Sequence, residues 1–262
     1  MEPEILYEDK EVLVINKPAG LIVHGDGKTK PARNATPAST ASHTNAGWHN
    51  VAGGEKTLVD WVLAKYPKIK EVGEPGRSAN GEIIYRPGVV HRLDRETTGA
   101  MIIAKTQKSF ENLKAQFKDH LIIKKYEAFV YGEIKKDNGS IDRPIGRSAK
   151  DFRMWSAQRG ARGEMREAIT NYKVISRGNG YSLLEVMPKT GRTHQIRVHF
   201  KAISYPLVGD SLYAPNRENS LGLKRLALHS KSVTFTDLKG KSHEVVAPYP
   251  EDFKEAIKLL SQ

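Results

Sequence analysis

The sequence predicts an α+β fold, with a largely antiparallel or mixed central sheet flanked by helices and loops. Segments with strand-like alternation outnumber segments with helical spacing. The two kinds rarely follow one another in the strand–helix–strand order that builds a parallel sheet. The chain has 262 residues, 39% of them hydrophobic, and shows no repeat or linker. We therefore expect a single domain over residues 1–262 with one substantial core.

The first part of the chain predicts strands, a loop insertion and a helix. Residues 5–24 are typical of two short strands broken by a Lys-Pro-Ala-Gly turn. Residues 25–56 are rich in small and polar side chains without an apolar period, which predicts a long flexible loop. Thr57 can cap the helix that follows, and a second loop rich in Gly and Pro covers residues 73–88.

The second part of the chain begins with an unbroken apolar run from Ala100 to Ala104, which predicts a strand buried on both faces. Residues 97–99 are expected to form the turn before it, and Thr106 can cap the helix after it. Later segments have strand character in five places and helical spacing in two. The expected strands are 122–134, 154–158, 167–177, 181–188 and 226–237, and the expected helices are 193–203 and 251–260.

The net charge of +12 favours a polyanionic partner, most often nucleic acid, over a basic surface of no specific use. The absence of cysteine excludes disulfides and thiolate zinc sites, and it fits a reducing cytosol. No apolar run approaches a membrane span, and the N-terminus lacks a signal peptide, so we expect a cytoplasmic protein without membrane contact. No GxSxG, phosphate-loop or GxGxxG motif is present, which leaves serine hydrolases, nucleotide hydrolases and dinucleotide enzymes unsupported.

The segment VVHRLDRETTGAMIIAK, residues 89–105, places Asp94 between Arg92 and Arg95 just before the predicted buried strand. A loop held by a rigid strand is a common place for catalytic residues. Nearby arginines favour an ionised aspartate, as a nucleophile requires. The plainer alternative is a surface aspartate that pairs with one of these arginines.

A second segment, PKTGRTHQIRVHF, covers residues 188–200. Residues 189–192 are expected to turn around a glycine, and Thr193 is expected to cap the helix. On that helix Thr193, His194 and Arg197 belong to one polar stripe, next to an apolar stripe that faces the core. Arg197 could thus reach a cleft, and the alternative is a solvated basic face. His194 and His199 are five residues apart, which is the wrong spacing for paired zinc ligands on one face.

Tyr126 lies in KKYEAFVYGEI, where alternation places Tyr126, Ala128 and Val130 on one side of a strand. A tyrosine in this place can stack on a base or fill the core. From the strand alone, a core position is the commoner outcome.

Together these segments resemble the catalytic domain of RluA-type pseudouridine synthases, in the same order along the chain. The resemblance covers residues 4–248, and it includes HRLDRETTG with Thr98 where serine is common in the family. A lone HRLD would be weak, but the ordered set is specific. The matching segments are VLVINKPAGLIVH, GVVHRLDRETTGAMIIAK, IKKYEAFVYG, LLEVMPKTGRTHQIRVHFKAISYPLVGDSLY and RLALHS.

The resemblance implies an enzyme that isomerises uridine to pseudouridine in ribosomal or transfer RNA, without a cofactor or metal. Asp94 would be its nucleophile or base, Tyr126 would pack on the target uracil, and Arg197 would pair with Asp94. Arg92 would help to flip the target nucleotide out of its stack. The other residues expected to contact RNA are His91, Arg95, Lys189, Arg192 and His194. No obligate protein partner is implied, and the lack of a coiled-coil period favours a monomer.

Two departures from the family pattern bear on RNA recognition. The chain begins at the first catalytic motif, so the S4 RNA-binding domain that many relatives carry is expected to be absent. The loop over residues 25–56 is longer than the family needs. The competing hypotheses are an inactive RNA-binding relative and a different RNA enzyme, such as a nuclease or methyltransferase. The intact Asp94, Tyr126 and Arg197 argue against the first, and the lack of a carboxylate cluster or glycine-rich cofactor loop argues against the second.

Overall fold

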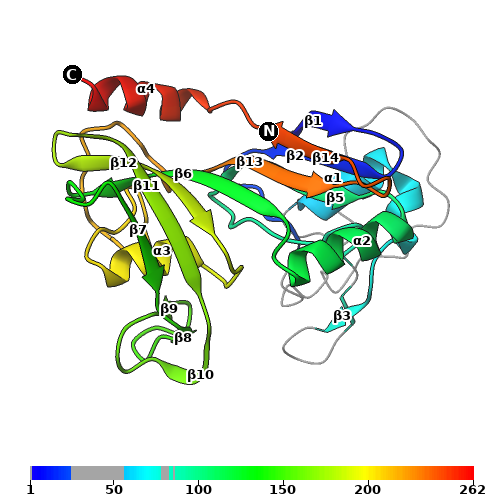
Figure 1. The fold of residues 1–262 in the computed structure, drawn as a ribbon, viewed down its shortest axis with the longest axis horizontal. Helices are drawn as coiled ribbons and strands as arrows, with labels where there is room; N and C mark the ends of the chain where they lie inside the picture. The colour runs from blue at the N-terminus through cyan, green and yellow to red at the C-terminus, as the bar shows by residue number, and fades with distance from the viewer. Residues whose placement is uncertain (1, 25–55, 78–82, 85) are drawn as a thin grey trace, which may run out of the picture.

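The computed structural model describes residues 2–24, 56–77, 83–84 and 86–262. Its centre is a nine-stranded sheet that bends through the molecule, as Figure 1 shows. One half of the sheet carries helices α1 (Leu58–Lys65) and α2 (Gln107–Lys118). The other half carries α3 (Gln195–Ala202) and α4 (Glu251–Leu260).

The sheet is almost entirely antiparallel, because its one parallel pairing joins β5 to β13. This confirms the expected α+β class and the mixed, largely antiparallel sheet. In spatial order the strands are β1 (Glu4–Glu8), β2 (Val12–Lys17), β5 (Thr98–Ala104), β13 (Leu228–Thr236), β6 (Ile123–Tyr131), β12 (Tyr181–Pro188), β11 (Ile169–Gly178) and β7 (Asn138–Asp142), with β14 (Ser242–Val246) paired to β13.

Smaller elements lie outside the main sheet. A three-stranded lobe projects from the β7–β11 end (Figure 1), and it consists of β8 (Ile145–Arg147), β9 (Trp155–Ser156) and β10 (Arg162–Arg166). The expected loop 73–88 contains a short hairpin of β3 (Gly76–Arg77) and β4 (Ile83–Ile84). A 3₁₀ turn, Pro67–Glu71, follows α1.

Side-chain caps begin two helices where the sequence predicts them. Thr57 accepts a hydrogen bond from the backbone N–H of Asp60, and Thr106 accepts one from Ser109, each within a capping box. The predicted cap of α3 is wrong. The cap is His194 in the left-handed conformation (φ 55°), and it makes no side-chain capping bond.

Two turn predictions also need correction. β1 and β2 both precede the Lys-Pro-Ala-Gly turn, because the Asp9 carboxylate accepts the N–H groups of Glu11 and Val12 and bends the chain there. Thr98 and Gly99 already belong to β5, so the turn before it lies at residues 95–96. The predicted loop 25–56 falls, except for residue 56, outside the described residues.

The strand β5 is the centre of the larger core. Every residue from Thr98 to Ala104 is buried, as its apolar sequence predicts. A second apolar cluster lies between α4 and the strands β6 and β12, where the rings of Phe129 and Phe253 have centroids 5.0 Å apart. Because β5 itself is buried along its whole length in the larger core, the loop that enters it ends on a rigid support.

Gly99 is needed where β5 meets β13. Its φ is +107°, and a Cβ there would lie 2.2 Å from the carbonyl oxygen of Ser230. We expect Gly99→Ala to lower the free energy of unfolding by about 2–5 kcal/mol, measured by urea denaturation. Gly240→Ala is the matched control, because Gly240 also has a positive φ but no neighbour within 4 Å of the added Cβ. Equal losses for both variants would show that the close approach to Ser230 costs nothing.

Candidate active site

A cavity of about 540 Å³ lies between the loop that precedes β5, strand β6 and helix α3. This volume suits a small organic ligand or one flipped nucleoside. Seven of the nine predicted site residues line the cavity. They are His91, Arg92, Asp94, Tyr126, Arg192, His194 and Arg197. The side chains of Arg95 and Lys189 are exposed and lie outside its lining.

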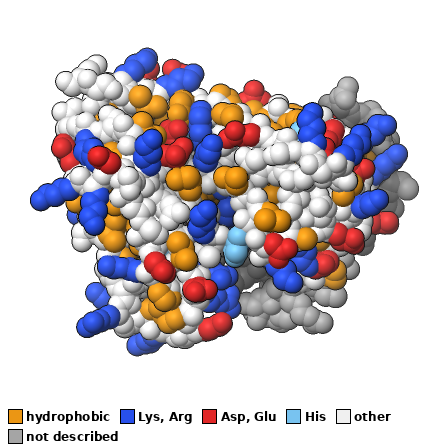
Figure 2. All heavy atoms as spheres, in the orientation of Figure 1, with side chains coloured by type: hydrophobic (Ala, Val, Ile, Leu, Met, Phe, Trp, Pro, Cys, Tyr) orange, Lys and Arg blue, Asp and Glu red, His pale blue; other side chains and the backbone are white. Residues whose placement is uncertain are grey.

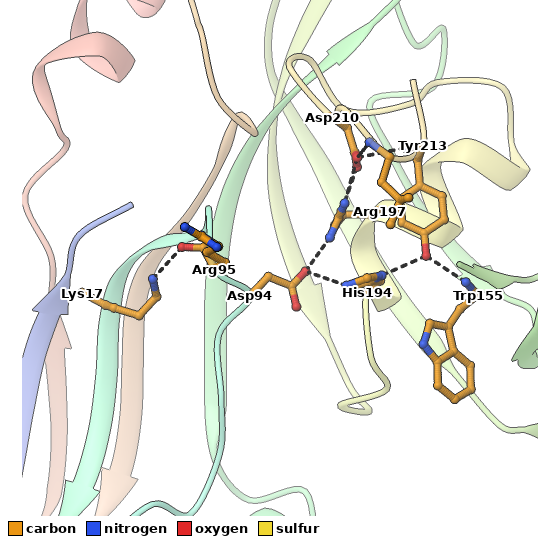
Figure 3. Close-up of polar contacts among 9 residues, drawn as sticks. Lys17, Asp94, Arg95, Trp155, His194, Arg197, Asp210 and Tyr213 are labelled. Atoms are coloured by element: carbon orange, nitrogen blue, oxygen red, sulfur yellow. Dashed lines mark hydrogen bonds and ion pairs between the residues drawn. The ribbon is translucent and has the colours of Figure 1, made fainter. Parts of the chain in front are cut away.

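Asp94 and Arg197, 103 residues apart in the sequence, meet in this cavity (Figure 3). Arg197 Nη1 donates to Asp94 Oδ2 at 3.0 Å. Arg197 also forms a bidentate pair with Asp210, with Nε and Nη2 each 2.8 Å from a carboxylate oxygen. One guanidinium thus binds a fully buried carboxylate on one edge and aims its remaining amino group at Asp94.

The position of Asp210 is set by the chain that follows α3. Its Oδ1 also accepts the backbone N–H groups of Leu212 and Tyr213 at 3.1 and 3.0 Å. Burial opposes the charge of Arg197, but the hydrogen bonds and charges of Asp210 and Asp94 outweigh burial and raise the pKa of Arg197. Arg197 therefore stays a cation and stabilises the negative charge of Asp94.

Tyr126 projects from β6 into the same cavity, and only 8% of it is exposed. Tyr126 is thus buried, as a core position requires, and it also lines the cavity, which leaves its face available to a ligand. Burial raises the pKa of Tyr126, so the phenol keeps its proton at neutral pH. It can donate a hydrogen bond or present its ring face to a flat ligand.

Comparison with known proteins shows the family. The family model described as RNA pseudouridylate synthase matches residues 11–202. The chain belongs to this family. The predicted enzyme class is thereby confirmed: the chain is an RNA pseudouridine synthase, an isomerase that acts on RNA.

Relatives cover almost the whole chain. An uncharacterised RNA pseudouridine synthase of Synechocystis is 35% identical over 260 residues, covering 99% of this chain and 69% of the relative. Ribosomal large subunit pseudouridine synthase D of Pseudomonas aeruginosa is 34% identical, covering 100% and 73%. The solved structure of human RNA pseudouridylate synthase domain containing 4 superposes with a TM-score of 0.69 at 24% identity, covering 98% and 93%, which shows the shared fold.

In this pseudouridine synthase His91 supports the wall of the cavity. Its Nε2 accepts the backbone N–H of Ile102 at 3.0 Å, and its ring stacks on Phe117 with centroids 4.8 Å apart. Burial lowers the pKa of His91 to about 3, so the ring is neutral and Nε2 is free to accept. The histidine thus ties the loop that carries Asp94 to strand β5.

The lowered pKa of His91 predicts a pH-dependent stability. Between pH 6.5 and about 3 the unfolded chain binds a proton that the folded chain does not, so the free energy of unfolding falls as the pH falls. His91→Gln keeps an acceptor without this proton and should flatten that fall by about 1.4 kcal/mol per pH unit, measured by urea unfolding between pH 6 and pH 4. His120→Asn, at an exposed histidine, is the control, and the change in slope for His91→Gln should exceed any change for this variant. If the free energies of unfolding of wild type and His91→Gln changed with pH in parallel, the lowered pKa of His91 would be contradicted.

Lys17 anchors the loop from the other side. Its buried ammonium group donates to the carbonyl oxygens of Pro18, Leu21 and Arg95 at 2.8–2.9 Å, and Figure 3 shows the bond to Arg95. Burial lowers the pKa of Lys17 to about 7. The turn after β2 is thus tied to the residue that directly follows Asp94.

Gln195 organises the turn at residues 189–192. Its Oε1 accepts from the Arg192 backbone N–H and from the Thr190 hydroxyl, at 2.9 and 2.7 Å. Arg192 Nε donates to the carbonyl oxygen of Glu167, which holds this cation at the cavity. Lys189 remains exposed on the outer side.

Sequence reasoning missed several residues of the site, Lys17 and Gln195 among them, and three others carry charge or hydrogen bonds close to Asp94 or in the cavity. The three are Asp210, Tyr213 and Lys124. Asp210 and Tyr213 lie in the GDSLY part of a family segment, where an aspartate after glycine is typical of an ordinary turn. Lys124 lines the cavity, and burial lowers its pKa to about 8. The sequence did not indicate this burial, because Lys124 and Lys125 at the start of β6 belong to a residue type that is usually exposed.

Basic side chains spread over both halves of the molecule on the face shown in Figure 2. No helix among the described residues is long and apolar enough to cross a membrane. Within the same part of the chain, no three His, Cys, Asp or Glu side chains gather as a metal site would require. The cavity therefore offers an RNA ligand one carboxylate, one buried tyrosine and several cations.

Proposed function

We propose that the cavity isomerises uridine in ribosomal RNA, with Asp94 as the reacting carboxylate and Arg197 as its positioning cation. The observation that carries the proposal is the 3.0 Å contact of Arg197 Nη1 with Asp94 Oδ2 inside a cavity of about 540 Å³. Ribosomal RNA is favoured because relatives at 33% and 34% identity are named ribosomal large subunit pseudouridine synthase D.

The reaction constrains what the site must do. The C1′–N1 bond breaks, the released uracil turns, and C5 bonds to C1′. C5 then loses its proton and N1 carries one in the product, so the overall change is an isomerisation. A carboxylate at the sugar can attack C1′ or remove the proton of the neighbouring carbon, and one at the base can add to C6. Each route needs an ionised Asp94 and an enclosed space that retains the free uracil. The ion pair with Arg197 supports an ionised Asp94, and the cavity provides the space that retains the uracil.

The target base must leave its stack to reach Asp94, at a cost of a few kcal/mol. In the proposal the exposed Arg92, at the cavity lining, occupies the vacated space, and Tyr126 packs against the flipped uracil. Phosphate contacts from the basic surface offset the cost of flipping, so binding should weaken steeply with salt.

The remaining predicted contacts differ in how the geometry supports them. Arg192 lines the cavity, so its place supports contact with the bound nucleotide. His194 also lines the cavity, but its ring faces Asp94, which favours a role at that carboxylate over the predicted contact with RNA. Arg95 and Lys189 are exposed beside it, which suits the flanking backbone phosphates. His91 is engaged with β5, so we assign it to shaping the loop. We further propose that residues 1–262 form one catalytic domain, which acts as a monomer in the cytoplasm, as the sequence indicates.

Tritium release from RNA labelled with [5-³H]uridine tests the proposal directly. The purified chain is incubated with ribosomal and with transfer RNA, in the presence of a chelator. Release from ribosomal RNA is expected without added metal or cofactor. Release only from transfer RNA would overturn the proposed substrate, and release that requires Mg²⁺ would overturn the proposed chemistry. Pseudouridine mapping in cells that lack the protein then locates the modified uridines.

A further inference from the structure

Helix α3 begins with a feature that the proposed roles leave unexplained. His194 adopts a left-handed backbone conformation, with φ 55°, and its side chain does not cap the helix. Such a conformation is unfavourable for a residue with a side chain, and it persists where the surrounding structure requires it. The consequence here is that the imidazole points into the cavity toward Asp94, as Figure 3 shows.

The hydrogen bonds around Tyr213 assign the proton positions on that imidazole. The Tyr213 hydroxyl oxygen accepts the backbone N–H of Trp155 at 2.9 Å and lies 2.9 Å from His194 Nδ1. Among the described residues, the acceptor available to the phenolic proton is therefore Nδ1. Burial raises the pKa of Tyr213 to about 12, which keeps that proton on the phenol. A neutral ring that accepts at Nδ1 carries its own proton on Nε2.

The Nε2–H group faces Asp94. His194 Nε2 is 3.9 Å from Asp94 Oδ2, the same oxygen that Arg197 Nη1 contacts at 3.0 Å. Between described residues, no hydrogen bond reaches the other oxygen, Oδ1. The distance of 3.9 Å is longer than a hydrogen bond, and contacts of this kind in unliganded enzymes tighten when substrate binds.

We infer that His194 is a positioning residue that, together with Arg197, holds Asp94 by Oδ2 and leaves Oδ1 as the oxygen that meets the substrate. Tyr213 acts through His194 by selecting the tautomer with its proton on Nε2. Trp155 belongs to β9 of the three-stranded lobe, and its backbone N–H donates to Tyr213. The lobe therefore takes part, through Tyr213 and His194, in setting the orientation of the reacting carboxylate. This inference rests on the proposed role of Asp94.

Charged neighbours set the conditions under which this arrangement operates. The ionisable groups that face His194 are Asp94, Arg197, Asp210 and Arg92, together with the phenol of Tyr213. Burial has the largest effect on the pKa of His194 and lowers it, so the ring is neutral near pH 7. Protonation at lower pH would add a positive charge beside Asp94 and make the carboxylate a weaker base or nucleophile.

The test is single-turnover tritium release at saturating ribosomal RNA, with RNA affinity measured separately. His194→Ala should lower the rate constant about 10- to 100-fold and change affinity less than about 3-fold. His194→Gln carries an amide N–H near the place of Nε2 and should recover most of the rate. Tyr213→Phe alone should lower the rate constant about 10-fold. Added to His194→Ala, it should lower the rate constant no further, because Tyr213 acts through His194.

A pH profile separates this role from a merely structural one. The rate constant of the wild type should fall on the acidic side as His194 takes up a proton, and His194→Gln should lack that part of the fall. Thermal unfolding of each variant checks that the chain is folded. Loss of RNA affinity with an unchanged rate constant for His194→Ala, or additive effects of the two substitutions, would overturn the inference. Failure of the underlying proposal is distinguishable, because Asp94→Asn would then remain active.

Discussion

Asp94→Asn is expected to lower pseudouridine formation by about 10⁴-fold or more, because the amide is neither a nucleophile nor a base. The substitution is nearly isosteric. Its side-chain oxygen can still accept from Arg197, whose bidentate pair with Asp210 is untouched. The loss should therefore appear in the rate constant of tritium release, with RNA affinity and thermal stability close to those of the wild type.

The matched control for Asp94→Asn is Asp137→Asn. Asp137 also pairs with an arginine, Arg177, at 2.7 Å, but its side chain is 81% exposed and lies outside the cavity lining. This variant should retain full activity. Substantial release of tritium by Asp94→Asn would remove Asp94 from the chemistry, whatever the behaviour of the control.

Asp210→Ala is expected to lower both stability and activity. It leaves a largely buried guanidinium without its bidentate partner, and loss of one member of a buried pair costs about 3–5 kcal/mol. Arg197 should then move toward Asp94 or toward water, and the reacting carboxylate loses its fixed orientation. A fall in the free energy of unfolding by urea should accompany a fall in the tritium-release rate constant of about 10- to 1,000-fold.

Asp252→Ala provides the comparison for Asp210→Ala. Asp252 forms a bidentate pair with Arg225 at 2.7 and 2.9 Å, but its side chain is 36% exposed. Its removal should cost less stability than Asp210→Ala, because water can enter the place of the partly exposed carboxylate and Arg225 keeps its hydrogen bond to the carbonyl oxygen of Leu226. The rate constant should be unchanged. If both variants lost the same stability and the same activity, the buried pair would have no special part in holding Asp94.

Local signals in the sequence were enough to predict much of the fold. Thr57 and Thr106 cap helices through their own side chains, so the residue type and the spacing identify the helix start. The apolar run from Ala100 to Ala104 required burial on both faces, and β5 is buried throughout. The meeting of Asp94 with Arg197 was predicted by the resemblance to a family, because no local pattern joins residues 103 positions apart.

The features that sequence reasoning missed depend on tertiary context. His194 replaces Thr193 as the cap of α3 because Tyr213, from a later loop, holds its ring. Asp210 is of a residue type that is common in turns, and only the folded chain places it beside Arg197. The bend at Asp9 arises from a side chain that accepts two backbone N–H groups. Sequence reasoning overlooked this bend and assigned the break between the two strands to the Lys-Pro-Ala-Gly turn, which follows β2.

A crystal structure of Asp94→Asn bound to a ribosomal RNA fragment that contains the target uridine would test the central claim most directly. The claim predicts a uridine turned out of its stack into the cavity. Its C1′, C2′ or C6 should lie within about 3.5 Å of the residue-94 side-chain atom that points away from Arg197. A uridine bound outside the cavity, or one in which none of these three atoms faces residue 94, would contradict the account.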